Sequence, residues 1–396
     1  MPFNNRSLIK GKYFPPGDKS ISHRILILAG QVVGKSKISN LLQGEDVLNT
    51  LKAMRLLGVR IFKTDTHYEV FGIPPGGLIQ PKKKIDFGNS GTGIRLISGL
   101  ISSNNIEVKL IGDSSLSKRP MKRVTEHLSK IGAIIKLRGE SFPPIKLKGT
   151  GNAVPLTFEI LIPSAQIKSA IMLSALNTNG TVKIKEFKTT RDHTENMLKS
   201  MGYNIKVKEN SLHRFIQMKN NQDLKTINYN VPGDPSSAAF FISAACLKPG
   251  SKLIVKNILF NKTRVGFIKT LKKMGGNIKV ISKRKIHNEL IADLKIEQKK
   301  LAKILINKNI KFICLAGFMK ILSPYFLNFF KDKIINIHPS LLPKYKGLNT
   351  HKRALKAKEK FSGCTIHYVS KKLDSGKIIA KKKVKIFKKD LSLIHI

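Results

Sequence analysis

A pattern that occurs four times constrains the fold more than any other feature of this sequence. Each copy is an amphipathic helix, with apolar residues near i, i+3, i+4 and i+7, that closes with a glycine and runs directly into a β-type segment. The copies read LNTLKAMRLLGVRI, VTEHLSKIGAIIKL, TENMLKSMGYNIKV and FIKTLKKMGGNIKV. Their glycines, Gly58, Gly132, Gly202 and Gly275, are 74, 70 and 73 residues apart. This spacing predicts a repeated α/β unit.

The repeat stops after its fourth copy. A fifth helix, glycine and strand would end near residue 345, where the sequence instead has the loop-like segment LLPKYKGLNT. A lysine-rich helical pattern, IEQKKLAKILINKNI, stands at the change, and we place a boundary near Glu297. From Lys311 the sequence predicts a buried strand and a turn, a helix through Phe330, and the strand IINIHPSLLP.

The net charge of +49, from 73 basic and 24 acidic residues, has two competing explanations. One is a surface that binds nucleic acid. However, the lysines are spread along the whole chain, tryptophan is absent, and the aromatic residues do not interleave with a basic stripe. We therefore expect no nucleic-acid partner, and we attribute the lysines to compositional drift.

Other features argue against several classes of protein. The longest strongly apolar run, Ala238 to Leu247, is far shorter than the roughly 20 residues of a membrane span. The N-terminal segment lacks the pattern of a secretory signal, so we expect a cytoplasmic protein without a membrane partner. Cys246, Cys314 and Cys364 lie far apart and show no metal-ligand spacing, which argues against zinc and against a disulfide framework.

Two segments near the N-terminus offer sites for anions. PPGDKSISHR opens a helix with Asp18 or Ser20 as N-cap, and it places Lys19 and Arg24 near free backbone N–H groups. FGNSGTGIRL has three glycines that permit a tight turn, whose amides can converge on a phosphate or carboxylate. The structural alternatives are a capped helix with solvated cations and an ordinary connector.

Two later segments add polar partners for phosphate oxygens. SKRP contributes Arg119, and PSAQIKSA offers Ser164, Gln166 and Lys168 as hydroxyl, amide and ammonium groups. Neither segment is specific when taken alone.

Taken together and in this order, the four segments resemble the 5-enolpyruvylshikimate-3-phosphate synthase family, over about Lys10 to Glu297. TRDHTENML, VPGDPSSAAFF and NKTRVGF agree further with that family. The resemblance implies an α/β fold of repeated βαβαββ units. A complete three-unit domain would span residues 18–232, and an incomplete first domain, with one unit of three, would combine residues 1–17 and 233–297.

The same resemblance implies transfer of the enolpyruvyl group of phosphoenolpyruvate to the 5-hydroxyl of shikimate 3-phosphate, with release of phosphate and without metal or organic cofactor. Lys19 would contact both substrates, and Ser20 and Arg24 would hold shikimate 3-phosphate. Gly91 and Arg119 would hold phosphoenolpyruvate. The remaining substrate-binding residues implied by the family motifs are Asn89 beside the phosphoenolpyruvate site, Ser164, Ala165 and Gln166 along the shikimate phosphate, and Arg191.

Some family features are altered or absent. Thr190 stands where the family often has serine, and Gly93 stands where alanine or threonine is usual. The family's later half carries an acidic general base, a Lys-x-Glu-Ser-Asp-Arg type segment, a late Asp-His-Arg and a late lysine, and none of these follows residue 297. Because general acid–base catalysis contributes about 100-fold to 10,000-fold, we expect impaired turnover.

The last hundred residues contain a second candidate site. Asn336 and His338 are two apart on a predicted strand, so both side chains point to one face, and Asp374 follows in KKLDSGK. Such a trio could polarise a carbonyl, relay a proton and orient the base. A core histidine and a turn aspartate are the structural alternative.

LAGFMKILSP, NIHPSLLPKYKG, NTHKRAL and Asp374 together resemble phosphoribosylglycinamide formyltransferase, over about Ile304 to Lys388. The resemblance implies a partial Rossmann-like domain over residues 298–396, with 10-formyltetrahydrofolate as co-substrate. It makes Asn336, His338 and Asp374 catalytic and Met319 to Leu322 folate-contacting. The glycine-rich phosphate loop of that family is absent, and Lys377 replaces a small residue or proline.

The sequence therefore leaves three hypotheses about the function of the whole chain. They are an impaired enolpyruvyl transferase, a glycinamide ribonucleotide formyltransferase, and a non-catalytic truncated or chimeric reading frame, which the unmatched C-terminal LSLIHI would fit. In the enzymatic readings we expect a monomer whose partners are anionic small molecules.

Overall fold

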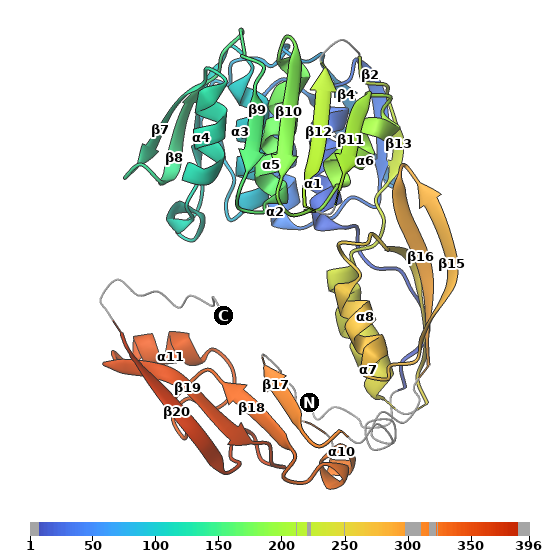
Figure 1. Ribbon diagram of the computed structural model, residues 1–396, viewed down its shortest axis with the longest axis vertical. Coiled ribbons are helices and arrows are strands. Elements are labelled where there is room, and N and C mark those ends of the chain that lie inside the picture. The colour runs from blue at the N-terminus through green and yellow to red at the C-terminus, as the bar shows by residue number, and fades with distance from the viewer. Residues whose placement is uncertain are drawn as a thin grey trace. The chain divides into compact units, whose positions relative to one another are not determined.

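The structure is a computed structural model that describes residues 8–210, 212–219, 223–248, 250–297, 310–316, 322 and 324–386. The chain divides into two compact units, a first unit of residues 1–298 and a second unit of residues 299–396. Helices and sheets alternate in both (Figure 1). Among the described residues, no helix is long and apolar enough to cross a membrane.

The described residues of the first unit form four sheets of one plan. In each sheet two parallel strands lie side by side, and two antiparallel strands continue the ladder. We number the four sheets by the order of their helices along the chain, and the second and third sheets follow the order βαβαββ. Their elements are β5 (Ile85–Asp86), α3 (Gly91–Ser102), β6 (Glu107–Ile111), α4 (Lys122–Lys130), β7 (Ile134–Arg138) and β8 (Phe142–Lys148), then β9 (Thr157–Ile160), α5 (Ala165–Ser174), β10 (Thr181–Glu186), α6 (His193–Ser200), β11 (Ile205–Glu209) and β12 (Arg214–Lys219).

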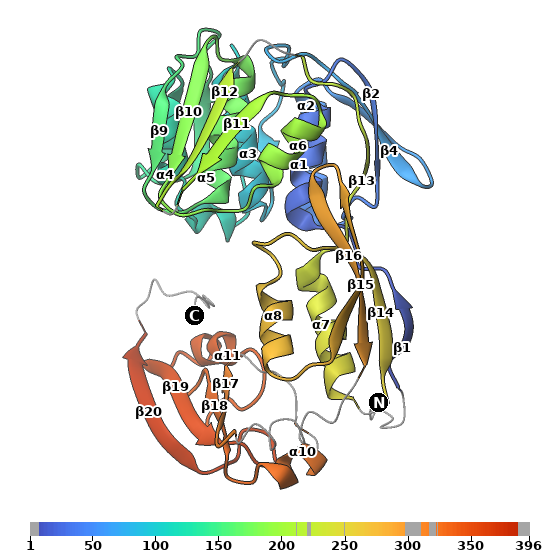
Figure 2. The ribbon, with the colours of Figure 1, turned by 45° about the vertical axis from the view of Figure 1, so that its right-hand side comes forward.

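The first and fourth sheets each take one strand from a distant part of the chain. β13 (Asn228–Asn230) pairs with β2 in the first sheet, and β1 (Lys10–Tyr13) pairs with β14 in the fourth (Figure 2). The other elements are α1 (Lys19–Ala29), β2 (Gly34–Ser39), α2 (Glu45–Leu56), β3 (Arg60–Lys63) and β4 (His67–Gly72) in the first, and α7 (Pro235–Leu247), β14 (Lys252–Leu259), α8 (Gly266–Lys273), β15 (Ile278–Ile286) and β16 (Glu289–Glu297) in the fourth.

The four repeated helices end as the sequence predicts. Gly58, Gly132, Gly202 and Gly275 have φ angles of +103°, +108°, +83° and +93°. Each lies two residues beyond the end of its helix, where the chain turns into a strand through a left-handed conformation that favours glycine. The predicted repeat of α/β units is therefore confirmed.

The chain passes twice between the first and the fourth sheet, and the two connecting segments, around Gly17 and Gly233, pack tightly against each other. Gly17 and Gly233 form an isolated bridge, and a Cβ atom on Gly17 would lie 2.0 Å from the carbonyl oxygen of Asn40. Only glycine fits there. Among the described residues of the first unit, buried hydrophobic side chains form two clusters, one from residues 21–231 with Leu259 and the other from residues 238–296.

The second unit has one sheet of strand order β17-β18-β19-β20, with β17 parallel to β18 and the other pairs antiparallel. Its elements are β17 (Ile313–Ala316), α10 (Pro324–Phe329), β18 (Ile334–His338), α11 (Thr350–Lys356), β19 (Phe361–Tyr368) and β20 (Ile378–Lys385). The prediction that the first of these strands is buried was wrong. β17 is the edge of the sheet within the described residues, and its side chains alternate between half-buried and exposed.

Candidate functional site

Helix α1 begins at the first predicted anion site. Asp18 is its N-cap and accepts a hydrogen bond from the backbone N–H of Ile21 at 3.0 Å, which decides between the two predicted caps. Lys19 follows, with its side chain about half exposed, and its ammonium group pairs with the carboxylate of Asp46. A partly exposed cation therefore lies at this helix end, and the Asp18 carboxylate occupies one of its backbone N–H groups.

Arg24 does not project toward solvent as the sequence pattern suggested. Its guanidinium is buried and donates to Thr194 Oγ1, the carbonyl oxygen of Ser20 and Ser169 Oγ, each at 2.9 Å. Burial is the main cause that lowers the pKa of Arg24, to about 10. The residue lies on the face of α1 that packs toward α5 and α6, so its donors connect these helices.

Three residues assigned to the phosphoenolpyruvate side lie together at the start of α3. Arg119 donates to the carbonyl oxygen of Asn89 at 3.5 Å and also to the side-chain oxygen of Asn89. A Cβ atom on Gly91 would lie 3.1 Å from Nη1 of Arg119 and 3.0 Å from Nη1 of Arg95. The missing side chain of Gly91 thus leaves room for two guanidinium groups beside a helix N-terminus.

Helix α5 starts next to α3. Ser164 caps α5 by accepting from the backbone N–H of Ile167 at 3.3 Å. The side chain of Gln166, in the first turn, donates to Thr92 Oγ1 at 2.9 Å and accepts from Arg95 at 3.0 Å. The N-terminal turns of α3 and α5, whose partial positive charge favours anions, are therefore held together.

A pocket of about 360 Å³ opens beside the N-terminus of α5. Its lining combines hydroxyl, amide and guanidinium groups, and no carboxylate or imidazole is among them. The lining residues are Ser164, Ala165, Gln166, Thr189, Thr190, Arg191 and Thr263. Four of these were candidates from the sequence. The pocket is suited to bind an oxyanion, but its own lining supplies no general base.

Arg191 connects this pocket to α1. Its Nη1 donates to Ser20 Oγ at 3.3 Å, so two of the predicted substrate-binding residues are in contact. Burial and, next, the positive charge of Arg264 lower the pKa of Arg191. The sequence analysis did not predict the three threonines of the lining as site residues, although it noted Thr190 as a family position. The run Thr189-Thr190-Arg191 just before a helix was a usable signal for two of them, because hydroxyl groups near a helix N-terminus commonly bind anions.

The sequence interpretation of Lys168 as a phosphate partner was wrong. Its ammonium group is fully buried, 2.9 Å from a carboxylate oxygen of Glu186 and 2.9 Å from one of Glu195. Lys168 lies one turn after Ser164 on α5, on the face that packs into the protein. Its charge is neutralised there and does not reach the pocket.

The comparisons with known proteins agree with this geometry. The family model described as EPSP synthase (3-phosphoshikimate 1-carboxyvinyltransferase) matches residues 4–319. The chain belongs to the EPSP synthase family. A 3-phosphoshikimate 1-carboxyvinyltransferase of Sphingopyxis alaskensis is 44% identical over 294 residues, which are 73% of this chain and 66% of that protein. One of Zymomonas mobilis is 44% identical over 290 residues, covering 73% and 64%.

Solved EPSP synthases share the fold. A structure of the Acinetobacter baumannii enzyme aligns with 73% of this chain and 65% of its own, with a TM-score of 0.68 and 37% identity. The mixed α/β sheets are therefore those of the family. This chain spans about two thirds of the length of the curated relatives it matches, 66% and 64% for the two named above.

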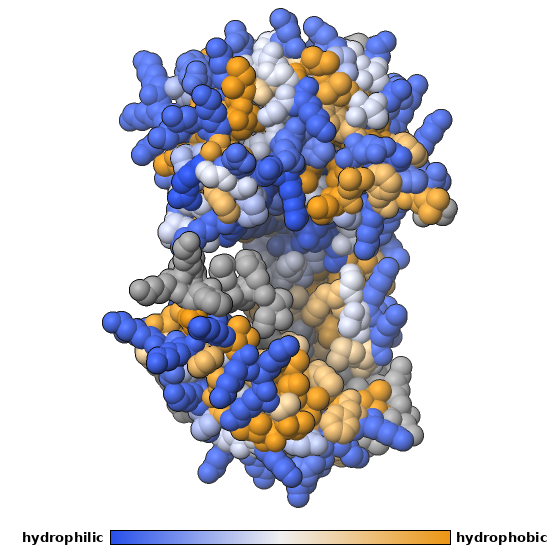
Figure 3. Space-filling view, turned by 60° about the vertical axis from the view of Figure 1, so that its left-hand side comes forward, coloured by the Kyte–Doolittle hydropathy of each residue, from blue (hydrophilic) through white to orange (hydrophobic). Residues whose placement is uncertain are grey.

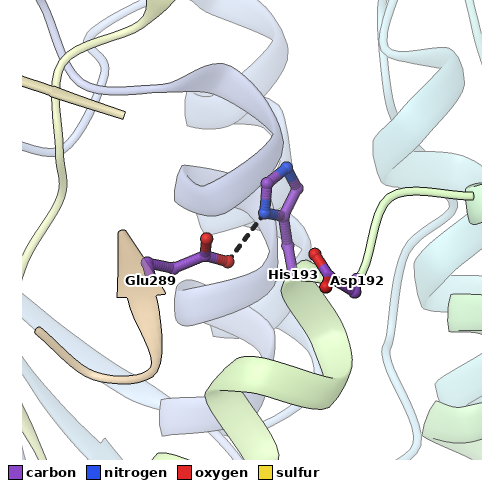
Figure 4. Close-up of side chains that lie close together, drawn as sticks. All are labelled: Asp192, His193 and Glu289. Carbon is purple, nitrogen blue, oxygen red and sulfur yellow. Dashed lines mark hydrogen bonds and ion pairs between the residues drawn. The ribbon is translucent and has the colours of Figure 1, made fainter. Parts of the chain in front are cut away.

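One group of side chains in the first unit has the residue types that commonly bind metal ions. Asp192 and His193 at the start of α6 lie beside Glu289 of β16, with ligand atoms within 4.8 Å of one another (Figure 4). His193 Nδ1 is 2.8 Å from Glu289 Oε1. The amide nitrogen of Asn261, however, donates to Asp192 at 2.7 Å and to Glu289 at 3.0 Å.

The orientation of that amide is fixed from its other side. Asn261 Oδ1 accepts from the backbone N–H of Thr263 at 2.9 Å and from its hydroxyl at 2.8 Å. Because the NH₂ group must then face the two carboxylates, it satisfies them and stands where a cation would bind. The cluster is a hydrogen-bonded junction between α6 and β16, and its residues as arranged do not fit a metal ion.

In the second unit the predicted trio lies together. Asn336 and His338 are buried on one face of β18, and His338 Nδ1 is 3.3 Å from Asp374 Oδ2. His338 Nε2 lies 3.0 Å from the carbonyl oxygen of Tyr345. Residues 319–321 of the predicted folate-contacting segment lie outside the described residues, as does the C-terminal LSLIHI.

His367 joins this trio and was not predicted. It lies on β19 directly opposite Asn336 in the antiparallel ladder, 3.4 Å from the Asn336 amide nitrogen and 3.7 Å from Asp374 Oδ1. The side-chain oxygen of Asn336 is buried without a hydrogen-bond partner among the described residues. A solved phosphoribosylglycinamide formyltransferase of Bacillus halodurans is 41% identical over 23% of this chain and 47% of its own, with a TM-score of 0.23.

Hydrophilic side chains, coloured blue in Figure 3, cover much of the visible face and alternate with hydrophobic patches. Lysines, which are spread along the whole sequence, are among the hydrophilic residue types.

Proposed function

We propose that this chain binds shikimate 3-phosphate and phosphoenolpyruvate through its first unit, and that this binding belongs to enolpyruvyl transfer. The observation that carries the proposal is the pocket at the N-terminus of α5, where Ser164, Gln166 and Arg191 line one cavity. Hydroxyl, amide and guanidinium donors are the groups that recognise a phosphate dianion. The family membership supports the choice of substrates.

The proposed residue roles divide between two neighbouring parts of the first unit. Shikimate 3-phosphate would contact the pocket, with Ser20 beside Arg191. Phosphoenolpyruvate would lie near Gly91 and Arg119, where a cation approaches the start of α3. The other proposed contacts are Lys19 for both substrates, Asn89 through its bonds to Arg119, Ala165 in the pocket, and Arg24, whose buried donors would have to rearrange to reach a ligand.

We further propose that turnover by this chain alone is small. In the reaction the 5-hydroxyl oxygen bonds to C2 of phosphoenolpyruvate, the bond from C2 to the phosphate oxygen breaks, and protons must move. The lining of the pocket has no carboxylate or imidazole for that task. Donors that hold the substrates lower the barrier only in part, since proton transfer needs a positioned base.

Calorimetric titration with shikimate 3-phosphate tests the binding. We expect the wild-type chain to bind, and Lys19→Ala and Gln166→Ala to weaken the affinity about tenfold or more, because each removes a proposed donor. Arg123→Met is a matched control, since Arg123 is exposed on α4 and has no partner among the described residues. Equal affinity in all four proteins would refute the site. Phosphate release at the rate of a full-length relative would refute the impairment.

A second candidate function rests on the second unit. The contact of His338 with Asp374, beside Asn336, favours transfer of a formyl group from 10-formyltetrahydrofolate, with His338 as the base. If this is correct, the chain binds that folate and Asn336→Ala abolishes the binding. Unchanged folate affinity in the Asn336→Ala variant would reject this function.

A further inference from the structure

Arg95, which none of the family motifs assigned to a substrate, lies between the two halves of the proposed site. It is four residues after Gly91 on α3 and half-buried. Its Nη1 donates to the carbonyl oxygen of Gly91 and to Oε1 of Gln166, each at 3.0 Å, and its Nη2 donates to the carbonyl oxygen of Pro120 at 3.1 Å. One guanidinium thus connects three segments that are distant in sequence.

These bonds decide how the side chain of Gln166 is oriented. A guanidinium has donors and no acceptor, so the atom of Gln166 that faces Arg95 must be the amide oxygen. The amide nitrogen is then on the opposite side, where one of its N–H groups donates to Thr92 Oγ1 at 2.9 Å. The second N–H group has no partner among the described residues, and Gln166 lines the pocket.

The direction of the amide matters for an anionic ligand. A phosphate oxygen accepts hydrogen bonds from an N–H group but is repelled by a carbonyl oxygen. Without Arg95, the amide could turn its oxygen to the pocket, because Thr92 can donate as well as accept. The fixed orientation therefore favours binding without requiring Arg95 to touch the ligand.

Resting on the proposed function, we infer that Arg95 is a positioning residue: it orients the Gln166 amide for the phosphate of shikimate 3-phosphate and anchors that amide to the turn at Gly91. Three of its N–H donors are directed to protein oxygens. Arg119 also approaches Gly91, because a Cβ atom there would lie 3.1 Å from Arg119 Nη1, so the turn that Arg95 anchors borders the proposed phosphoenolpyruvate side.

Calorimetric titration of variants with shikimate 3-phosphate tests the inference. Arg95→Met should weaken binding about tenfold or more, since a charge-assisted arrangement is lost, whereas Arg123→Met, with the same change in charge, should bind like wild type. The double variant Arg95→Met with Gln166→Ala should bind shikimate 3-phosphate no more weakly than Gln166→Ala alone, because both substitutions remove the same interaction with the phosphate. Additive losses, or an Arg95→Met affinity equal to that of Arg123→Met, would overturn the inference.

The side-chain amide of Gln166 gives an independent measurement on the unmodified chain. Its two N–H protons give separate signals in a nitrogen-15 NMR spectrum, because rotation about an amide C–N bond is slow, and they are assigned by their loss in Gln166→Ala. The N–H that donates to Thr92 should exchange slowly with water, and the other N–H should exchange faster. Equally fast exchange of both would contradict the inference even if Arg95→Met fails to fold. If the wild-type chain binds no shikimate 3-phosphate, the proposed function fails, and the exchange rates still show whether the amide is anchored.

Discussion

Replacement of Lys168 by methionine should destabilise the first unit far more than an ordinary loss of an ion pair. Lys168 is fully buried, and its two partners, Glu186 and Glu195, are each about 1% exposed. Methionine keeps most of the side-chain volume but removes the charge. Two carboxylates would then remain buried without their cation.

The size of the destabilisation depends on how far the two buried carboxylates are compensated once Lys168 is replaced. Arg214 is 3.5 Å from Glu195 and compensates that carboxylate in part, and Glu186 keeps a hydrogen bond from the hydroxyl of Thr190. Removing one partner of a buried ion pair costs about 3–5 kcal/mol. Lys185→Met is the matched control, since Lys185 lies 3.0 Å from Glu159 with both side chains partly exposed, and surface pairs contribute about 0–1 kcal/mol.

Hydrogen exchange measured by mass spectrometry, on peptides from α5 and β10, reports this region separately from the second unit. A loss of about 3 kcal/mol speeds exchange roughly a hundredfold at amides that open with the whole region. Adding Glu186→Gln to Lys168→Met should recover part of the loss, because one uncompensated charge is removed. If Lys168→Met and Lys185→Met exchange at the same rate, burial does not set the strength of this pair and the reasoning fails.

Three further predictions concern packing, the buried junction and pH. Gly99→Ala should lower stability by about 1–3 kcal/mol in thermal melts, because its Cβ would lie 2.3 Å from the carbonyl oxygen of Ala170 and separate α3 from α5, whereas Gly266→Ala, with open space around it, should change little. Glu289→Ala should cost about 2 kcal/mol or more, because His193 loses its acceptor and the Asn261 amide keeps only Asp192. Added zinc should leave the thermal midpoint of the wild-type chain unchanged, and a rise with zinc would contradict the role given to Asn261. For Asp293, burial alone would raise the pKa, but hydrogen bonds from Lys256 and the Asn257 N–H outweigh it and lower the pKa to about 2. The ionised carboxylate therefore adds stability above its unfolded pKa, near 4, and this contribution is lost as the pH falls toward 2. Asp293→Asn should have a lower free energy of unfolding than wild type at pH 7, and the two values should converge in acid. A difference in unfolding free energy that does not change with pH would refute this.

Much of the first unit could be predicted because its signals are local. The spacing of apolar residues defines each helix, and a glycine two residues past its end forces a left-handed turn into the next strand, as Gly58 and Gly132 show. In the second unit, the alternation of side chains along a strand likewise predicted that Asn336 and His338 lie on one face of β18. The family motifs supplied the candidate residues around Ser164.

The sequence by itself determined the elements, their order and the chemical types available to the site. Only the tertiary structure decided which cations stay exposed: Arg24 and Lys168 follow helix starts just as Lys19 does, yet both are buried among partners from α6 and β10. It also brought Thr263 to the pocket and His367 to Asn336. The physical reason is that helix and strand periods fix the face on which a side chain lies, whereas the neighbour of that face comes from packing between segments far apart in the chain.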